Sequence, residues 1–348
     1  MISRTDAPNF LESAKKLPVL DVRSPGEFRQ GHIPGAFNLP LFTDEERAVV
    51  GTLYHRSGRE ASVLKGMELA GPRMAYYAEQ SKVLAPGNEL LLHCWRGGMR
   101  SENMAWLLDQ AGFRVTLLDG GYKAYRSFIR SEWNRETRVI ILGGMTGSGK
   151  TRILDCLEKL GEQVIDLEKI AHHKGSVFGG LGQEPQPTNE QFENNLYQSW
   201  QEFNLTGTIW MEDESRMLGN ITIPVPVFEK IGRSPMILAE TDPEMRIANL
   251  VAEYSGFSKE ELGQAISKIS EKLGGTRTQL ALQDIRQGDY AAAAGRVLEY
   301  YDKAYRNAVA KRENREIYPV RADQKDPMEN ARRILMESRK IRNLKPVS

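Results

Sequence analysis

Gly144-Met145-Thr146-Gly147-Ser148-Gly149-Lys150-Thr151 is the stretch that decides the fold of the second half of this chain. It matches the phosphate-loop pattern G-x-x-x-x-G-K-[S/T] and follows the apolar run Val139 to Leu142, which predicts a buried strand. A helix is expected to begin near Lys150. Glycines let backbone N–H groups turn inward around a polyphosphate, and the helix N-terminus adds a favourable dipole. Lys150 would meet the terminal phosphates, and the Thr151 hydroxyl would hold Mg²⁺.

The segments around this loop alternate as in a doubly wound sheet. Strands are expected at Gln163 to Asp166, Thr208 to Met211 and Met236 to Ala239, separated by helical stretches such as Glu190 to Phe203 and Pro243 to Tyr254. This alternation predicts the α/β class and a P-loop NTPase-like, doubly wound domain. The residues beyond it, with Tyr290 to Lys311 rich in alanine, tyrosine and charge, predict a helical C-terminal region.

A carboxylate that helps to hold the metal ion is expected after a neighbouring strand. Glu212, Asp213 and Glu214 follow the strand Thr208 to Met211. We predict Asp213 as this Walker B residue. The end of the strand leaves its two neighbours as alternatives, and a plain acidic surface turn is a further one.

A second loop, His93-Cys94-Trp95-Arg96-Gly97-Gly98-Met99-Arg100, also has the composition of an anion site. It follows the apolar strand Glu89 to His93 and precedes a helix expected to start within Ser101 to Met104. The glycines permit tight curvature, the arginines add positive charge, and the helix N-terminus favours an anion. Together these features should lower the pKa of the Cys94 thiol and make it the nucleophile.

Composition indicates a globular protein of more than one domain. The chain has 348 residues, which is longer than one hydrophobic core usually supports. Its composition, 40% hydrophobic and 27% charged, is that of an ordinary globular protein. We expect domains at residues 1–130 and 131–348, with a helical insertion at about 42–77 in the first. The chain has two cysteines, no secretory signal and no apolar run near about eighteen residues, so a cytoplasmic setting without membrane contact is expected. Cys156 is expected in the core.

Charge and histidine content give weaker indications. The net charge of +1 decides nothing about nucleic acid, because a basic footprint is local. One basic segment lies near the C-terminus and reads as either an RNA-binding surface or a solvated helix face: Arg332, Arg333, Arg339, Lys340, Arg342 and Lys345. His172 and His173 lack a third ligand at metal-binding spacing, so a structural or surface role is favoured.

Upstream segments carry a resemblance to rhodanese domains. The N-terminal signature of these domains is resembled by two segments, Leu20-Asp21-Val22-Arg23-Ser24-Pro25-Gly26-Glu27-Phe28 and Gly31-His32-Ile33-Pro34-Gly35-Ala36-Phe37-Asn38-Leu39-Pro40. The C-terminal end of the domains is resembled by Asp119-Gly120-Gly121-Tyr122. The resemblance implies an N-terminal rhodanese-like parallel sheet. Most of these residues are expected to be structural. The loop from Cys94 to Arg100 is longer than that of common sulfur-carrying rhodaneses and has the length seen in related cysteine-dependent phosphatases. Two chemistries therefore compete: Cys94 attacks phosphorus, or it attacks a chalcogen bound to phosphorus.

The order of the two loops in one chain resembles the tRNA 2-selenouridine synthase family. Further segments carry it: Asp166-Leu167-Glu168, His173-Lys174-Gly175-Ser176 and Glu212-Asp213-Glu214-Ser215-Arg216. The resemblance implies a transferase that replaces sulfur by selenium in 2-thiouridine at the tRNA wobble position, with selenophosphate as donor. It also implies an S-geranylated intermediate made from geranyl diphosphate. The partner is then tRNA rather than DNA, and no tightly bound cofactor is expected.

The resemblance distributes these steps over the two loops. Cys94 would take selenium as a perselenide while Trp95, Arg96, Gly97, Gly98, Met99 and Arg100 bind the phosphate part of the donor. Lys150 and Thr151 would hold the diphosphate leaving group, although a P-loop grips polyphosphate whichever molecule carries it. Two other readings stay open: a cysteine phosphatase fused to a P-loop kinase, which lacks a clear general acid, and a non-enzymatic, nucleotide-sensing sulfur-relay scaffold.

Overall fold

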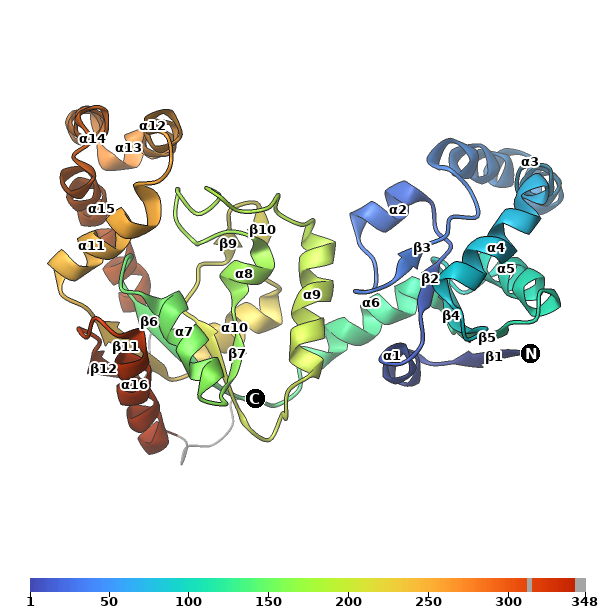
Figure 1. Ribbon diagram of the computed structural model, residues 1–348, viewed down its shortest axis with the longest axis horizontal. Helices are drawn as coiled ribbons and strands as arrows, with labels where there is room; N and C mark the ends of the chain where they lie inside the picture. The colour runs from blue at the N-terminus through green and yellow to red at the C-terminus, as the bar shows by residue number, and fades with distance from the viewer. Residues whose placement is uncertain (312–314, 342–348) are drawn as a thin grey trace. The chain divides into compact units, whose positions relative to one another are not determined.

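The computed structural model describes residues 1–311 and 315–341 and divides the chain into two compact units (Figure 1). The N-terminal unit is Met1–Trp133 and the C-terminal unit is Asn134–Ser348, against an expected division at residue 130. Each unit has its own five-stranded parallel sheet. The predicted α/β class, with one parallel-sheet unit followed by another, is confirmed.

In the N-terminal unit the strands lie in the order β1-β5-β4-β2-β3. Their bounds are Ile2–Thr5 (β1), Val19–Asp21 (β2), Phe37–Asn38 (β3), Glu89–His93 (β4) and Arg114–Leu118 (β5). The helices are α1 (Ala7–Ala14), α2 (Pro25–Gln30), α3 (Asp44–Ala70), α4 (Met74–Leu84), α5 (Met99–Gln110) and α6 (Gly121–Glu132), with a 3₁₀ turn at Gly71–Arg73. The central strand β4 is almost wholly buried because helices cover both faces of a parallel sheet.

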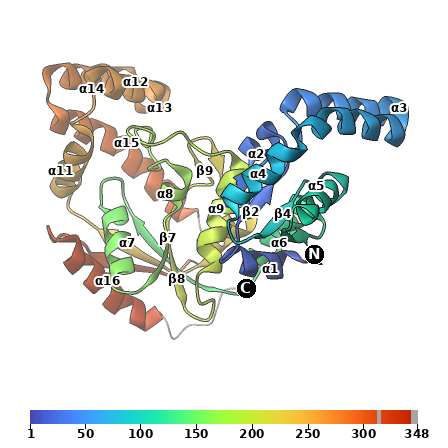
Figure 2. The ribbon, with the colours of Figure 1, turned by 45° about the vertical axis from the view of Figure 1, so that its right-hand side comes forward.

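The insertion expected at about 42–77 is helical and extends further, to the end of α4 at Leu84. Its helix α3 begins with a capping box, in which Thr43 and Glu46 satisfy each other's backbone N–H groups. At Gly58 the backbone takes φ 83°, a left-handed value that a side chain disfavours, so α3 is two helical arms joined at a kink. Figure 2 shows α3 projecting away from the sheet of its unit.

In the C-terminal unit the main sheet has the order β12-β11-β6-β8-β7. The strands are β6 (Arg138–Gly144), β7 (Gln163–Ile165), β8 (Thr208–Glu212), β11 (Met236–Glu240) and β12 (Ile317–Arg321), and β9 (Met217–Leu218) pairs with β10 (Ile221–Thr222) in a small hairpin. The helices around the sheet are α7 (Lys150–Lys159), α8 (Leu167–Ala171), α9 (Asn189–Gln201) and α10 (Val225–Arg233). Strand β6 is buried almost throughout, so the P-loop leaves from the centre of the sheet.

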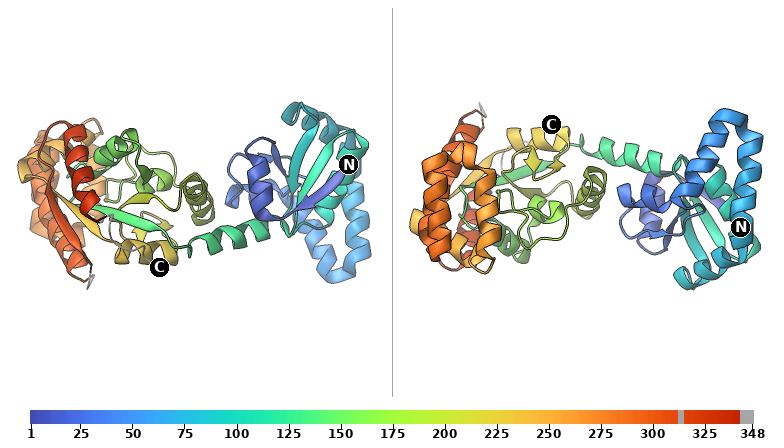
Figure 3. Two further views of the ribbon diagram at one scale, coloured as in Figure 1. Left: turned by 90° about the horizontal axis from the view of Figure 1, so that it is seen from below. Right: turned by 90° about the horizontal axis from the view of Figure 1, so that it is seen from above.

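The C-terminal region is mostly helical, as predicted, and gathers at one side of the unit (Figure 3). Its helices are α11 (Pro243–Tyr254), α12 (Lys259–Lys268), α13 (Ser270–Leu273), α14 (Gly275–Gln287), α15 (Tyr290–Ala310) and α16 (Pro327–Ile341). The edge strand β12 was not predicted. It is short, half-exposed and contains Pro319, which fits an edge position but obscures the strand signal in the sequence.

Helix α16 carries the basic segment. Arg333 pairs with Asp323 at 3.2 Å and Lys340 with Glu337 at 2.7 Å, so acidic neighbours offset part of its charge. Arg342 and Lys345 lie outside the described residues. Over the part of the chain that the structure describes, no helix combines the length and the apolar character needed to cross a membrane.

Candidate functional site: a thiol loop and a phosphate loop

The thiol loop, residues 94–98, connects the end of β4 to the start of α5 and rests on the first turn of α6. Backbone N–H groups of Tyr122 and Lys123 donate to the carbonyls of Cys94 and Trp95 at 2.9 and 3.0 Å. At Gly121, φ is 59° and a Cβ would lie 2.5 Å from the carbonyl oxygen of Cys94. Only glycine fits there, which explains why the Asp119-Gly120-Gly121-Tyr122 segment accompanies the cysteine.

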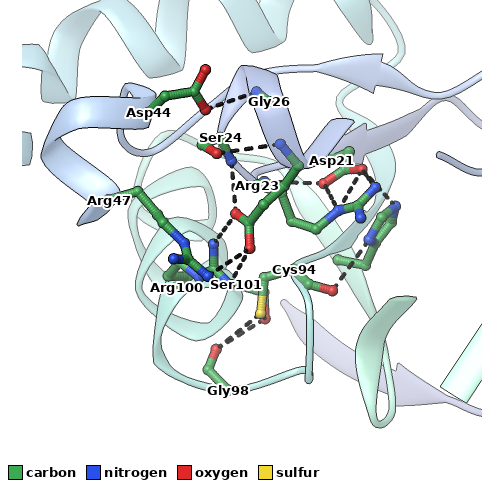
Figure 4. A network of polar contacts seen from close by, with 12 residues as sticks. Asp21, Arg23, Ser24, Gly26, Asp44, Arg47, Cys94, Gly98, Arg100 and Ser101 are labelled. Carbon is green, nitrogen blue, oxygen red and sulfur yellow. Dashed lines mark hydrogen bonds and ion pairs between the residues drawn. The ribbon is translucent and has the colours of Figure 1, made fainter. Parts of the chain in front are cut away.

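Cys94 is 3% exposed, and its sulfur lies 3.1 Å from the Ser101 hydroxyl oxygen. That hydroxyl also lies 3.0 Å from the carbonyl oxygen of Gly98, to which it can donate (Figure 4). A Cys94 thiol can donate to Ser101, whereas a thiolate can accept the hydroxyl proton. Ser101 therefore offers a partner to both protonation states, a role the sequence analysis did not assign to it.

The two arginines predicted for this loop lie differently. Arg96 is exposed, whereas Arg100 donates to the Glu27 carboxylate at 2.6 Å. Arg47, from α3, lies 3.6 Å from the same carboxylate and was not predicted. Burial alone would raise the pKa of Glu27, but the hydrogen bond and charge of Arg100 hold that pKa below its usual value. The loop therefore has two cations gathered around one ionised carboxylate.

A buried ion pair lies beneath the thiol loop. Asp21 and Arg23 are both fully buried, and the Arg23 Nε atom lies 2.9 Å from Asp21 Oδ2. The guanidinium also donates to the Gly31 carbonyl at 2.7 Å and stacks on the Tyr122 ring, 3.7 Å from its centroid. Burial lowers the pKa of the adjacent His93. These contacts tie the signature segments together and account for them as supports of the loop.

The phosphate loop, residues 144–149, depends on glycine at two tight positions. Gly147 has φ 79°, and a Cβ there would lie 2.7 Å from the carbonyl oxygen of Arg246. Gly149 has φ 81° and directly precedes α7. The Lys150 ammonium donates to the Gly144 carbonyl at 3.1 Å, so the cation lies over the loop. This is the geometry in which backbone N–H groups and a lysine grip a phosphate.

Two helices of the C-terminal region brace this loop from outside. Arg246 and Asn249 on α11 donate to the carbonyls of Thr146 and Gly147 at 2.8 and 2.9 Å. Tyr305 on α15 accepts the N–H of Gly144 at 3.0 Å. The sequence analysis did not find these residues, because their spacing from the loop along the chain carries no local signal.

Asp213, the predicted Walker B residue, is engaged elsewhere. Its carboxylate accepts from the Tyr305 hydroxyl at 3.0 Å and from Arg315 at 2.9 Å. The Thr151 hydroxyl instead lies 3.3 Å from the carboxylate of Glu168, to which it donates. The structure therefore brings Glu168, at the start of α8, to the position that the sequence analysis gave to Asp213.

Glu168 belongs to a buried acidic group. Burial raises the pKa of Glu168 to about 6, and burial together with Glu168 raises the pKa of Glu214 to about 8. Burial raises the pKa of Glu212 well above its usual value, and its carboxylate accepts the N–H of Glu168 at 3.2 Å. Gly175, with φ 64°, allows the chain to pass close to Glu168 and Glu214, since a Cβ there would lie 2.7 Å from a Glu168 oxygen.

The donors fit a Mg²⁺ ion that arrives with its phosphates. Among the described residues, no group of three or more His, Cys, Asp or Glu is arranged to hold a metal ion. Thr151 and Glu168 supply one hydroxyl and one carboxylate, and Mg²⁺ commonly takes one or two protein oxygens plus phosphate oxygens and waters. These two residues would hold the ion, and the ion would neutralise phosphate charge.

The remaining predicted residues have structural surroundings. Cys156 packs in the core of the C-terminal unit, as expected, and burial raises its pKa. His172 Nδ1 lies 3.0 Å from the Pro185 carbonyl, and burial lowers the pKa of His173.

Comparison with known proteins covers both units. The model of the tRNA 2-selenouridine synthase AAA domain matches residues 137–333, and that of the rhodanese-like domain matches residues 4–128. A tRNA 2-selenouridine synthase of Pseudomonas fluorescens is 34% identical over 83% of this chain and 87% of its own length. One from Bdellovibrio bacteriovorus is 36% identical over 80% and 82%. The solved structure of a rhodanese-related protein from Thermoplasma volcanium, 20% identical, covers 36% of this chain and 92% of its own, with a TM-score of 0.24. The two matched domains, in this order and with relatives along most of the length, place the chain in the tRNA 2-selenouridine synthase family.

Proposed function

We propose that this chain replaces sulfur by selenium in 2-thiouridine at the tRNA wobble position, in the cytoplasm, with selenophosphate as donor. The sulfur is first geranylated from geranyl diphosphate, and selenium then displaces the geranylthio group. The observation that carries this proposal is a cysteine held against Ser101 in a glycine-containing loop, in the same chain as a P-loop. The match of residues 137–333 to the AAA domain of tRNA 2-selenouridine synthases, and the similarity to such synthases along most of the chain, support it.

In the geranylation step the P-loop holds the diphosphate. The thiouridine sulfur attacks the first carbon of the geranyl chain, the carbon–oxygen bond breaks, and diphosphate leaves with the electron pair. Backbone N–H groups of residues 144–149 and the Lys150 ammonium stabilise the charge that develops on this leaving group. Mg²⁺ held by Thr151 and Glu168 would add to that neutralisation.

A small apolar cavity of about 50 Å³ lies beside the P-loop. Thr146 of the loop forms one wall, and the rest comes from α11, α12, α14 and α15, including Leu250, Tyr254, Val297 and Tyr301. The Tyr301 hydroxyl accepts the N–H of Val177 at 2.8 Å, so this polar group already has a partner outside the cavity lining. The cavity is too small for a whole geranyl chain, but its apolar wall next to the loop suits the first carbons of a prenyl group and offers a base few hydrogen bonds.

In the selenium step Cys94 forms an S–Se bond to the donor while the thiol loop holds the phosphorus end. The Se–P bond breaks with its electron pair on phosphorus, so the phosphorus product of this route is phosphite. The selenium on Cys94 then bonds to carbon 2 of the base, and the geranylthio group leaves. A thiol reductant finally breaks the S–Se bond, so that selenium stays on the base. Phosphorus NMR distinguishes the two possible products. If orthophosphate is the only one, the selenium of the donor attacks the base directly.

Nucleoside analysis of tRNA tests the function as a whole. Cells that contain the protein and a selenium source should hold 2-selenouridine, and cells lacking the gene should hold 2-thiouridine only. Purified protein with selenophosphate, geranyl diphosphate and tRNA containing 2-thiouridine should restore the selenium nucleoside. If the purified protein converts neither 2-thiouridine nor its S-geranyl form, the proposal is wrong.

A further inference from the structure

A large groove runs along the N-terminal unit between the insertion and α5. It has a volume of about 850 Å³, within the usual range for ligand sites. Both arms of α3 contribute to it, together with the start of α4 and one face of α5. The kink at Gly58 brings the second arm back along the first, so the groove exists because α3 is not straight.

The wall of this groove is apolar yet open to solvent. Tyr54 is 56% exposed, Met67 61%, Met74 41% and Trp106 55%. Large apolar side chains gathered at an open surface mark a binding site, because single ones are common and clusters are not. Methionines also adapt their shape to flexible hydrocarbon ligands.

The charged side chains that line the groove are all cationic: Arg47, Arg59 and Arg100. Arg47 and Arg100 also contact the Glu27 carboxylate, which is not part of the lining. Arg59 has no ion-pair partner among the residues that the structure describes. An apolar wall with cations beside it fits a ligand that joins a hydrocarbon group to phosphate groups.

The groove reaches the residues that directly follow the thiol loop. Met99 and Arg100, which follow the loop at the start of α5, also line the groove, and Arg100 contacts Glu27 near Cys94. Met104 lines the groove and packs in the same core cluster as Cys94. A group bonded to the atom that reacts near Cys94 can therefore extend directly into the groove.

We infer that this groove binds the S-geranylated wobble nucleotide of the tRNA, with the ten-carbon chain on its apolar wall and neighbouring phosphates on Arg47 and Arg59. This inference rests on the proposed function, since it assigns a site to the intermediate of that reaction. It makes the thiol-loop unit selective for geranylated over unmodified tRNA. When selenium displaces the geranylthio group, the geranyl chain then stays bound to the protein and is not exposed to water.

Binding of two anticodon stem-loop RNAs, one with 2-thiouridine and one with its S-geranyl form, tests the assignment. The full-length Met67→Asp variant should bind the geranylated RNA with a dissociation constant at least about tenfold larger, because the new carboxylate opposes burial of the hydrocarbon. Its dissociation constant for the 2-thiouridine RNA should change little. Met336→Asp is the matched control, since Met336 is a similarly exposed methionine, at 66%, on α16. Arg59→Gln should weaken both RNAs by a similar factor.

The outcomes separate this inference from the proposed function. Equal losses for both RNAs in Met67→Asp would make the groove a general RNA surface and overturn the inference, as would unchanged binding of both. Conversion of the geranylated RNA to 2-selenouridine by the wild-type protein is measured in parallel. If that conversion fails, the proposed function falls; if it succeeds while Met67→Asp binds normally, only the groove assignment falls.

Discussion

The thiol loop and the phosphate loop begin from the same architecture and end in opposite electrostatic surroundings. Each leaves the C-terminal end of a buried central strand, turns on at least one glycine with positive φ and enters a helix. Around the thiol loop, Arg47 and Arg100 gather on one carboxylate, Glu27. Around the phosphate loop, one lysine faces a buried group of carboxylates.

This difference indicates two kinds of anion. Arginines around a thiol suit a small, bare anion, because guanidinium groups supply both charge and paired hydrogen bonds. Carboxylates beside a P-loop repel a bare diphosphate but suit one that carries a divalent cation. Under the proposed function, the phosphate loop therefore suits a diphosphate that carries a metal ion, and the thiol loop suits a donor without one.

Cys94→Ser should have the largest effect and should separate the loops completely. An alcohol is not ionised at neutral pH and does not hold a chalcogen chain, so 2-selenouridine formation should fall to background. Geranylation should continue, because the P-loop is untouched. Mass spectrometry of digested tRNA measures both products, with Cys156→Ser as the control; a Cys94→Ser protein that still makes 2-selenouridine contradicts the role of the thiol.

Lys150→Ala should produce the converse defect. Loss of one charged contact to phosphate costs about 1.5 to 3 kcal/mol, which corresponds to roughly a ten- to hundredfold slower geranylation. Supplying tRNA that is already geranylated should restore 2-selenouridine formation. A normal geranylation rate would mean that the P-loop is not the diphosphate site and would favour a nucleotide there.

The acidic group should make the C-terminal unit sensitive to pH. Folding raises the pKa of Glu214 from 4.5 to about 8, so its proton stabilises the fold at low pH, and this stability is lost as pH rises through 8. Glu214→Gln should therefore raise the melting temperature more at pH 8 than at pH 5. Calorimetry at the two values measures the difference; an equal shift at both would mean that Glu214 ionises normally in the folded protein.

Arg100→Gln should give the smallest effect, a several-fold change. Selenophosphate should bind several-fold more weakly, because the variant loses one guanidinium that can donate to the phosphate oxygens. Arg114→Gln is a suitable control, since Arg114 pairs with Glu89 at the start of β4. If the dissociation constant for selenophosphate is unchanged, Arg100 has no part in the anion site.

Local patterns predicted the loops well and their surroundings poorly. Glu89–His93 and Pro243–Tyr254 have the predicted bounds, because apolar runs and helix-capping signals are local. Strand β12 and the partners of the P-loop on α11 and α15 were missed, since residues about 100 to 160 positions away meet only in the folded chain. The sequence could not tell which of three adjacent carboxylates turns toward Thr151. In the structure the Asp213 carboxylate is held instead by Tyr305 and Arg315.

The contact between Glu27 and Arg100 has a consequence for selectivity among the anions of a cell. A ligand that uses this arginine must displace an internal carboxylate already in place. Chloride and bicarbonate carry one charge and offer weaker competition, whereas a dianion or trianion with several oxygens can replace both hydrogen bonds. We therefore expect the resident carboxylate to exclude monovalent anions from Arg100 more strongly than phosphate-like dianions.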